Sequence, residues 1–367
     1  MTLHRLKGEH GGSQREYVDV QLDKSYVAFQ GSQQEALAVY LSGNLVFRFK
    51  EPATIKHIRV HLSGVRRVSL PSRTGWKKSC KEEEFYKKSW DFHDAYRTTP
   101  EVLPVGDHRY PFTVVLEGSM PESVERMKEA SIAYFFTVEI GRKHGRDVSY
   151  RKPLHVIRSP TLYDVAMTLD EVWAEKLLYR IHIPSKAVAF GTSLDVNYDF
   201  VPLLQDLKIE YIESQLLEVR EFAINEDEVV SGRNSSTTTT ILSSDRYIID
   251  DNTAECTMKS IGGYQFSRTL HLPKTLGQCV QDTDALGITV KHKLQVNARM
   301  QNPDGHVSEL RLTIPVSIYL SPYYRVWGGD SFVSEDLPPI PVICDSEEVP
   351  PPYGQHETDR LYRLALE

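Results

Sequence analysis

The sequence predicts an all-β protein made of two tandem β-sandwich domains followed by a flexible, proline-containing tail. Three observations support this prediction. Apolar residues recur at every second position in many short segments, turn residues separate these segments, and prolines cluster towards the C-terminus. A period of two is typical of strands that bury one face. Many short strands with turns between them are typical of sandwiches or barrels.

The first half of the chain contains two clear alternating segments. Their apolar faces are Ile58, Val60 and Leu62, and then Ile132, Tyr134, Phe136, Val138 and Ile140. We expect both faces to pack inside a sandwich. Between them, Ser119 and Glu122 have the spacing of a helix capping box. The segment 119–129 is compatible with a short helix and equally with a loop.

The second half repeats the pattern. Its apolar faces are Leu194, Val196, Tyr198 and Phe200, then alternate residues from Ile288 to Met300, then Leu310, Leu312, Ile314, Val316, Ile318 and Leu320. His292 is the one interruption of the middle segment. Asn302-Pro303-Asp304-Gly305 lies between the last two segments, and its proline and glycine suit a tight reversal. We therefore predict a hairpin here.

A domain boundary is expected near Pro160, where one strand pattern stops before another begins after Trp173. Within the second domain, residues 225–255 break the pattern with an acidic segment and a run of serine and threonine, which predicts a mobile insertion. The expected organisation is an N-terminal tail at 1–16, a first domain at 17–159, a second domain at 160–322 and a tail at 323–367.

Composition excludes several classes of protein. The formal net charge of -7 argues against nucleic acid as a partner. No apolar run approaches the roughly 20 residues that span a bilayer, and the N-terminus lacks the apolar core of a signal peptide. We therefore expect a cytoplasmic chain. The four cysteines, Cys80, Cys256, Cys279 and Cys344, lie far apart without CxxC pairing, which predicts reduced thiols and no zinc site.

Sequence patterns that carry chemistry are missing. The chain has no glycine-rich phosphate loop, no G-x-S-x-G elbow and no HExxH pair. Its thirteen histidines are scattered, and none has ligand spacing beside a carboxylate or a cysteine. We therefore expect no enzyme, no cofactor and no metal.

A group of basic residues in the first domain has two interpretations. His57, Arg59 and His61 share one strand face, and Arg66 and Arg67 follow closely. A solvated polar face is normal in a sandwich and is the favoured interpretation. The alternative is a basic stripe that contacts phosphorylated cargo or anionic lipid.

Ser69 raises a similar choice. A basic residue, Arg66, stands three positions before it, and Pro71 stands two after it, which suits a kinase site read by a phosphoserine-binding adaptor protein. A strand end followed by a proline-marked turn explains the same residues, and we favour it because such short motifs often match by chance.

The tail carries a more specific motif. Pro350, Pro351 and Tyr353 form a PPxY sequence. With 20 prolines and 19 tyrosines in 367 residues, chance gives about 0.06 such matches. Proline fixes the backbone dihedral φ, so the segment is already close to polyproline II and loses little entropy on binding. WW domains bind such segments in an aromatic groove.

Several segments closely resemble one family. They are Arg109–Phe112, Leu116–Val124, Tyr264–Ser267, Leu272–Leu276, Gln301–His306 and Leu310–Val316. The chain resembles the fungal α-arrestins, or arrestin-related trafficking adaptors, and among them the CreD type of HECT ubiquitin ligase-interacting proteins. The resemblance runs from about Tyr17 to Tyr362. It implies arrestin-like N-terminal and C-terminal domains and a ligase-binding motif at Pro350, Pro351 and Tyr353.

The chain departs from the CreD type in two ways. CreD-type proteins usually continue into a long tail rich in serine and threonine, whereas this sequence stops at Glu367. A shortened paralogue and an incomplete gene model both stay open. Only one PPxY is present, because the segment 336–340 lacks the tyrosine. A single motif provides no avidity, so we expect modest ligase engagement.

Three functions are weighed. In the first, the arrestin domains bind phosphorylated membrane cargo such as transporters or receptors, and the tail recruits the WW domains of a HECT-type ligase. This promotes cargo ubiquitination, endocytosis and carbon-source-dependent regulation at the plasma membrane or endosomes. The second is a ligase-independent arrestin-fold scaffold or sorting protein. The third is an enzyme, which the missing motifs make the weakest.

Overall fold

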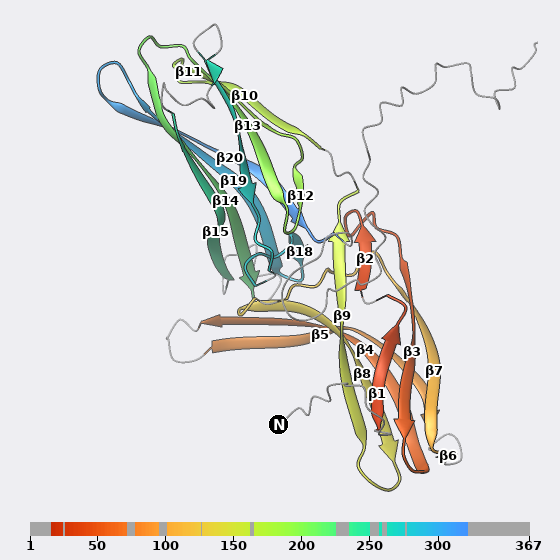
Figure 1. Cartoon of the computed structure of the whole chain (residues 1–367). Coiled ribbons are helices and arrows are strands. Elements are labelled where there is room, and N and C mark those ends of the chain that lie inside the picture. Colours follow the sequence, from red (N-terminus) through yellow and green to blue (C-terminus); the bar gives the residue numbers. More distant parts are fainter. Residues whose placement is uncertain are drawn as a thin grey trace, which may run out of the picture. The chain divides into compact units, whose positions relative to one another are not determined.

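The structure is a computed structural model that describes residues 16–24, 26–71, 78–94, 101–125, 127–161, 165–224, 235–249, 257–258, 263–275 and 277–321. These residues form strands and no helix (Figure 1). The strands gather into four sheets, two in each half of the chain. The all-β fold class is therefore confirmed. Among the described residues, no helix is long and apolar enough to cross a membrane.

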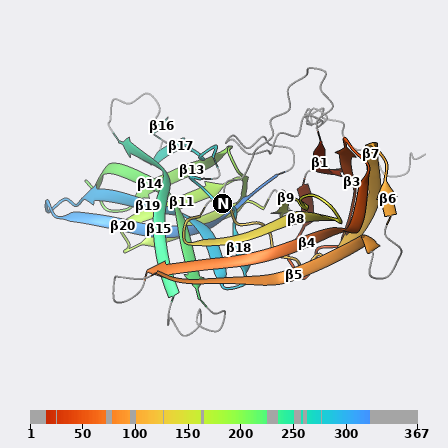
Figure 2. The ribbon, with the colours of Figure 1, turned by 90° about the horizontal axis from the view of Figure 1, so that it is seen from below.

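The first sandwich contains nine described strands. They are β1 (Tyr17–Leu22), β2 (Tyr26–Gln30), β3 (Val39–Phe49), β4 (Ala53–Pro71), β5 (Lys78–Asp94), β6 (Glu101–Leu103), β7 (Gly106–Leu116), β8 (Ala130–Arg142) and β9 (Val148–Ser159). One sheet has the order β1-β3-β7, and the other has the order β2-β9-β8-β4-β5 with β6 beside β4. The long strands β4 and β5 run side by side as an antiparallel hairpin (Figure 2).

The second sandwich contains eleven described strands. They are β10 (Met167–Trp173), β11 (Leu177–Ile183), β12 (Ala187–Ala189), β13 (Ser193–Pro202), β14 (Lys208–Ala223), β15 (Ser235–Ile248), β16 (Thr257–Met258), β17 (Tyr264–His271), β18 (Thr283–Ala285), β19 (Ile288–Gln301) and β20 (Val307–Tyr319). Its sheets have the orders β10-β11-β13-β17-β16 and β12-β20-β19-β14-β15, with β18 beside β19.

The predicted apolar faces lie in the cores. All six tested side chains are at most 2% exposed: Ile58, Val60, Leu62, Leu194, Val196 and Tyr198. The predicted hairpin is β19 and β20, in which Leu294 pairs with Ile314. Gly305 closes its turn with a φ of +84°, a backbone conformation that favours glycine because no Cβ is present to clash. The alternation therefore predicted the cores and the hairpin correctly.

The core of the first sandwich continues into the second half of the chain. Its cluster of buried apolar residues includes five that follow the expected boundary: Phe222, Val280, Ala285, Ile288 and Val290. In the other direction, Ile157 of β9 belongs to the cluster of the second sandwich. Both sandwiches lie in one compact unit.

The predicted mobile insertion at 225–255 is wrong for its central part. Strand β15 occupies residues 235–248 and pairs with β14 from Tyr211↔Ile248 to Ala223↔Ser235. The run of serine and threonine appeared mobile because it is polar. Threonine is β-branched, however, and favours strands, and an edge strand can keep its hydroxyl groups in water. Residues 225–234 and 250–256 lie outside the described residues.

The described residues of segment 119–129 form a loop and no helix. Val124 makes an isolated bridge to Ile132 instead. Glu122, the second member of the possible capping box, is only 3% exposed and accepts a hydrogen bond from Arg158 Nε at 2.9 Å. This glutamate therefore holds a buried ion pair to β9 and does not cap a helix.

Candidate functional site

The PPxY motif of Pro350, Pro351 and Tyr353 lies outside the described residues. Its assignment as a WW-domain ligand stays a prediction from the sequence. The structure instead positions the residues predicted on β4 and reveals a set of buried polar contacts that sequence reasoning missed.

His57, Arg59 and His61 share one face of β4 and are half-buried. Acidic neighbours lie on the strands at either side. Arg59 Nε donates to Asp91 Oδ1 of β5 at 2.8 Å, and His61 Nε2 lies 3.8 Å from Glu139 Oε2 of β8. Charges of both signs therefore alternate across this face, which is the pattern of an ordinary solvated sheet. Contact with phosphate or lipid stays a prediction.

The remaining predicted residues on this strand have different environments. The ring of His57 covers Gly141, where an added Cβ would approach it to 2.4 Å. Arg67 is exposed, and Ser69 is half-buried. The main-chain nitrogen of Ser69 donates to Glu129 O at 2.6 Å, which joins this end of β4 to the segment before β8. Phosphorylation of Ser69 stays a prediction.

The inclusion of Arg66 in a basic surface stripe is wrong. Arg66 lies an even number of positions from the core residues Leu62 and Val68 on β4. Its side chain is 2% exposed. Successive side chains of a strand point to opposite faces. The adjacent arginines Arg66 and Arg67 therefore belong to different environments, one inside and one in solvent.

The guanidinium group of Arg66 links the two halves of the chain. It donates to Leu286 O from Nε at 2.5 Å, to Ala223 O from Nη2 at 2.6 Å and to Ile224 O from Nη1 at 3.0 Å. Nη1 also lies 3.2 Å from Glu83 Oε2. The planar fork of donors of an arginine suits this arrangement, in which three main-chain carbonyl groups converge on one side chain.

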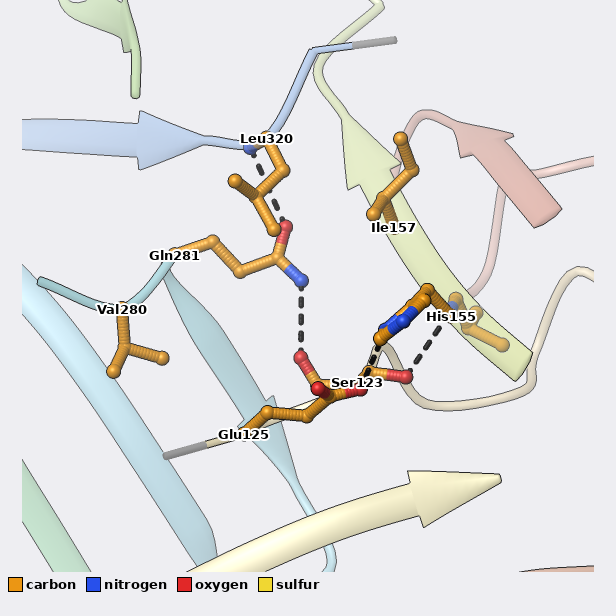
Figure 3. A pocket seen from close by; sticks show the side chains of 8 residues that line it. Ser123, Glu125, His155, Ile157, Val280, Gln281 and Leu320 are labelled. Carbon is orange, nitrogen blue, oxygen red and sulfur yellow. Dashed lines mark hydrogen bonds and ion pairs between the residues drawn. The ribbon is translucent and has the colours of Figure 1, made fainter. Parts of the chain in front are cut away.

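A small pocket is lined by residues from both halves of the chain (Figure 3). Its lining residues are Ser123, Glu125, His155, Val156, Ile157, Val280, Gln281 and Leu320. Gln281 Nε2 donates to Ser123 O at 3.3 Å, and His155 Nδ1 lies 2.7 Å from Glu125 Oε1. The cavity volume is about 20 Å³, which is enough for roughly one water molecule. The pocket is therefore too small for an organic ligand.

A cluster of buried charged groups occupies the second sandwich. Glu218 of β14 and His292 of β19 are both fully buried, with Glu218 Oε2 3.2 Å from His292 Nε2. His292 Nδ1 lies 2.5 Å from Asp282 Oδ1. Arg220 Nε donates to Glu218 Oε1 at 2.6 Å. The sulfur of Cys279 lies 3.9 Å from His292 Nε2.

The pKa values of this cluster follow from burial and pairing. Burial lowers the pKa of His292, but the hydrogen bonds that its ring makes with Asp282, Cys279 and Glu218, in which the carboxylates accept, outweigh burial and raise the pKa to about 11. Burial raises the pKa of Glu218, but its bonds to His292 and to a main-chain nitrogen lower it overall. Burial raises the pKa of the Cys279 thiol. The sequence shows His292 as the break in the alternation, but its partners lie on other segments, with Glu218 74 residues away.

The described strands define a protein of two tandem β-sandwiches that are joined by a buried arginine. Residues 18–163 match the family "Arrestin (or S-antigen), N-terminal domain", and residues 173–323 match "Arrestin (or S-antigen), C-terminal domain". The chain belongs to the arrestin family. This confirms the resemblance, the two arrestin domains and the expectation of a non-enzymatic protein.

Several similar proteins match nearly the whole chain. It is 56% identical over 370 residues to the HECT-type ubiquitin ligase-interacting protein apyA of Emericella nidulans, with 99% of both chains covered. It is 43% identical to the HECT-type ubiquitin ligase-interacting protein creD of the same organism, covering 99% of this chain and 62% of creD. A probable creD protein of Aspergillus terreus is also 43% identical, with 99% and 65% covered.

Proposed function

We propose that the chain is an adaptor that brings a HECT-type ubiquitin ligase to membrane cargo. The arrestin domains bind phosphorylated transporters or receptors, and the tail binds WW domains of the ligase. Ubiquitination and endocytosis of the cargo follow, under the control of the carbon source. The adaptor acts in the cytoplasm and is recruited to the plasma membrane or endosomes.

One observation carries the proposal: a PPxY sequence at Pro350, Pro351 and Tyr353 follows two arrestin domains. The names of the relatives apyA and creD support the choice of ligase class. The prolines offer a stiff ridge with free carbonyl groups. The tyrosine adds a large apolar ring with a polar tip, which suits an aromatic groove that is open to water at its rim.

The test is a pull-down of the full chain with the WW domains of a HECT-type ligase. Tyr353→Ala should abolish binding and leave the thermal melt unchanged, because the matched arrestin domains end at residue 323. Tyr362→Ala, a tail tyrosine outside the motif, is the matched control and should bind normally. Equal binding by Tyr353→Ala would refute the proposal and favour a ligase-independent scaffold.

A further inference from the structure

We propose that Glu218, Cys279 and His292 form a Zn²⁺ site in the second sandwich, in which Asp282 orients the histidine. The donor atoms of these three residues all lie within 4.8 Å of one another. They come from β14, from the segment before β18 and from β19. The proposal is independent of ligase binding, because it concerns only residues inside the fold.

The distances between the donor atoms fit tetrahedral zinc. Zinc bonds to sulfur, nitrogen and oxygen are about 2.0–2.3 Å long, which separates neighbouring ligand atoms in a tetrahedron by roughly 3.3–3.6 Å. Glu218 Oε2 is 3.2 Å from His292 Nε2, and Cys279 Sγ is 3.9 Å from the same nitrogen. The separation between Cys279 Sγ and the Glu218 carboxylate is within 4.8 Å, so a shift of about 1 Å or less in these side chains would bring all three donor atoms onto one ion.

The histidine is held in the orientation that a metal ligand needs. His292 Nδ1 lies 2.5 Å from Asp282 Oδ1, and the same oxygen accepts a hydrogen bond from Ile318 N of β20 at 2.8 Å. A carboxylate on one ring nitrogen fixes the tautomer and turns the other nitrogen towards the metal, an arrangement common in zinc proteins. His292 Nε2 is the nitrogen that faces Glu218 and Cys279.

Electrical charge balances in both states. Without metal, the cluster contains two cations, Arg220 and protonated His292, opposite two carboxylates, Glu218 and Asp282. When Zn²⁺ binds, bonds form from zinc to Sγ, to Nε2 and to a carboxylate oxygen, while the thiol proton and the Nε2 proton pass to solvent. The two positive charges gained replace the two protons lost, so no net charge is added to the interior.

The sulfur distinguishes this proposal from a simple ion-pair cluster. Arginine, glutamate, histidine and aspartate satisfy one another without any metal, but Cys279 adds only weak contacts, 3.6 Å to Val280 O and 3.9 Å to His292 Nε2. A zinc ion would use that thiolate fully, because sulfur is a preferred zinc ligand. Three protein ligands leave the fourth position to a water molecule.

The test uses the full chain without a polyhistidine tag, carrying Cys80→Ser, Cys256→Ser and Cys344→Ser, so that Cys279 is the one remaining cysteine. Titration with Co²⁺ should produce a near-ultraviolet sulfur-to-cobalt charge-transfer band that saturates at one equivalent and disappears when Zn²⁺ is added. Zinc should also raise the melting temperature of the protein after chelator treatment. Absence of the band and of stoichiometric zinc in this variant would overturn the proposal.

Variants of the intact chain locate the ion. Cys279→Ser should lose the charge-transfer band and weaken zinc binding at least about tenfold, and Asp282→Asn should weaken it by roughly 10–100-fold while keeping the band. Cys80→Ser, which removes an exposed thiol, is the matched control and should bind zinc normally. Full zinc affinity in folded Cys279→Ser would overturn the site. If Cys279→Ser does not fold, the cobalt and zinc titrations of the variant that keeps Cys279 as its one cysteine decide whether the site exists.

Discussion

Replacement of Arg66 by leucine should strongly destabilise the protein. The side chain is 2% exposed, and its guanidinium group donates to three main-chain carbonyl oxygens at 2.5–3.0 Å. Leucine fills part of the volume but provides no donor. Each buried acceptor left unsatisfied costs about 1–3 kcal/mol, and water can relieve some of them. We therefore expect the free energy of unfolding to fall by about 3–5 kcal/mol.

Calorimetry with matched variants measures this effect. At about 2–4 °C per kcal/mol, the melting temperature should fall by roughly 6–20 °C. Arg67→Leu changes the exposed neighbour and should stay within about 0.5 kcal/mol of the parent. Arg66→Lys should lie between the two, since a lysine keeps the charge but lacks the planar fork. If the free energies of unfolding of Arg66→Leu and Arg67→Leu differ by less than about 1 kcal/mol, the inferred link between the sandwiches is refuted.

Three further outcomes are expected. Pro341→Tyr completes a second PPxY sequence and should raise the affinity for a tandem WW-domain protein about tenfold or more through avidity. An unchanged affinity in a binding titration would argue against the motif. Gly141→Ala brings a Cβ to 2.4 Å from a histidine ring and should destabilise the fold by about 1–3 kcal/mol in denaturant unfolding. Gly277→Ala meets no atom within 4 Å, so an equal loss there would contradict this explanation. Iodoacetamide should label exposed Cys80 and spare buried Cys279 in the native protein, as read by peptide mass spectrometry; equal labelling would contradict the burial.

The strands and their buried faces were predictable because alternation is a local property. Ile58, Val60 and Leu62 can be buried together only if one face of the strand turns inwards, and no distant residue is needed to infer this. The same rule also predicts a buried Arg66, because this residue lies an even number of positions from the three apolar residues. Adjacency to Arg67 and a shared charge instead suggest a surface position, which is wrong for Arg66 because neighbouring residues of a strand face opposite sides.

The rest depended on contacts between distant residues. Arg66 is buried because carbonyl groups some 160 to 220 positions later lie around it. His292 was noticed as a break in an apolar face, but nothing local indicates that Glu218, Cys279 and Asp282 surround it. Strand β15 was missed for another reason: polarity suggested mobility, whereas pairing along β14 determines the structure of this segment.

The cluster of apolar residues that crosses the boundary has a consequence for any attempt to divide this protein. A fragment that ends at Ser159 would lack five side chains that cover the first core, among them Phe222 and Val290. It would also leave the cation of Arg66 without its three carbonyl partners. The two domains have separate core clusters, but side chains from the second half of the chain complete the first core, so we expect the domains to unfold cooperatively. The proposed cargo binding is therefore best tested on both arrestin domains together, because a single domain would expose apolar core surface and be prone to aggregation.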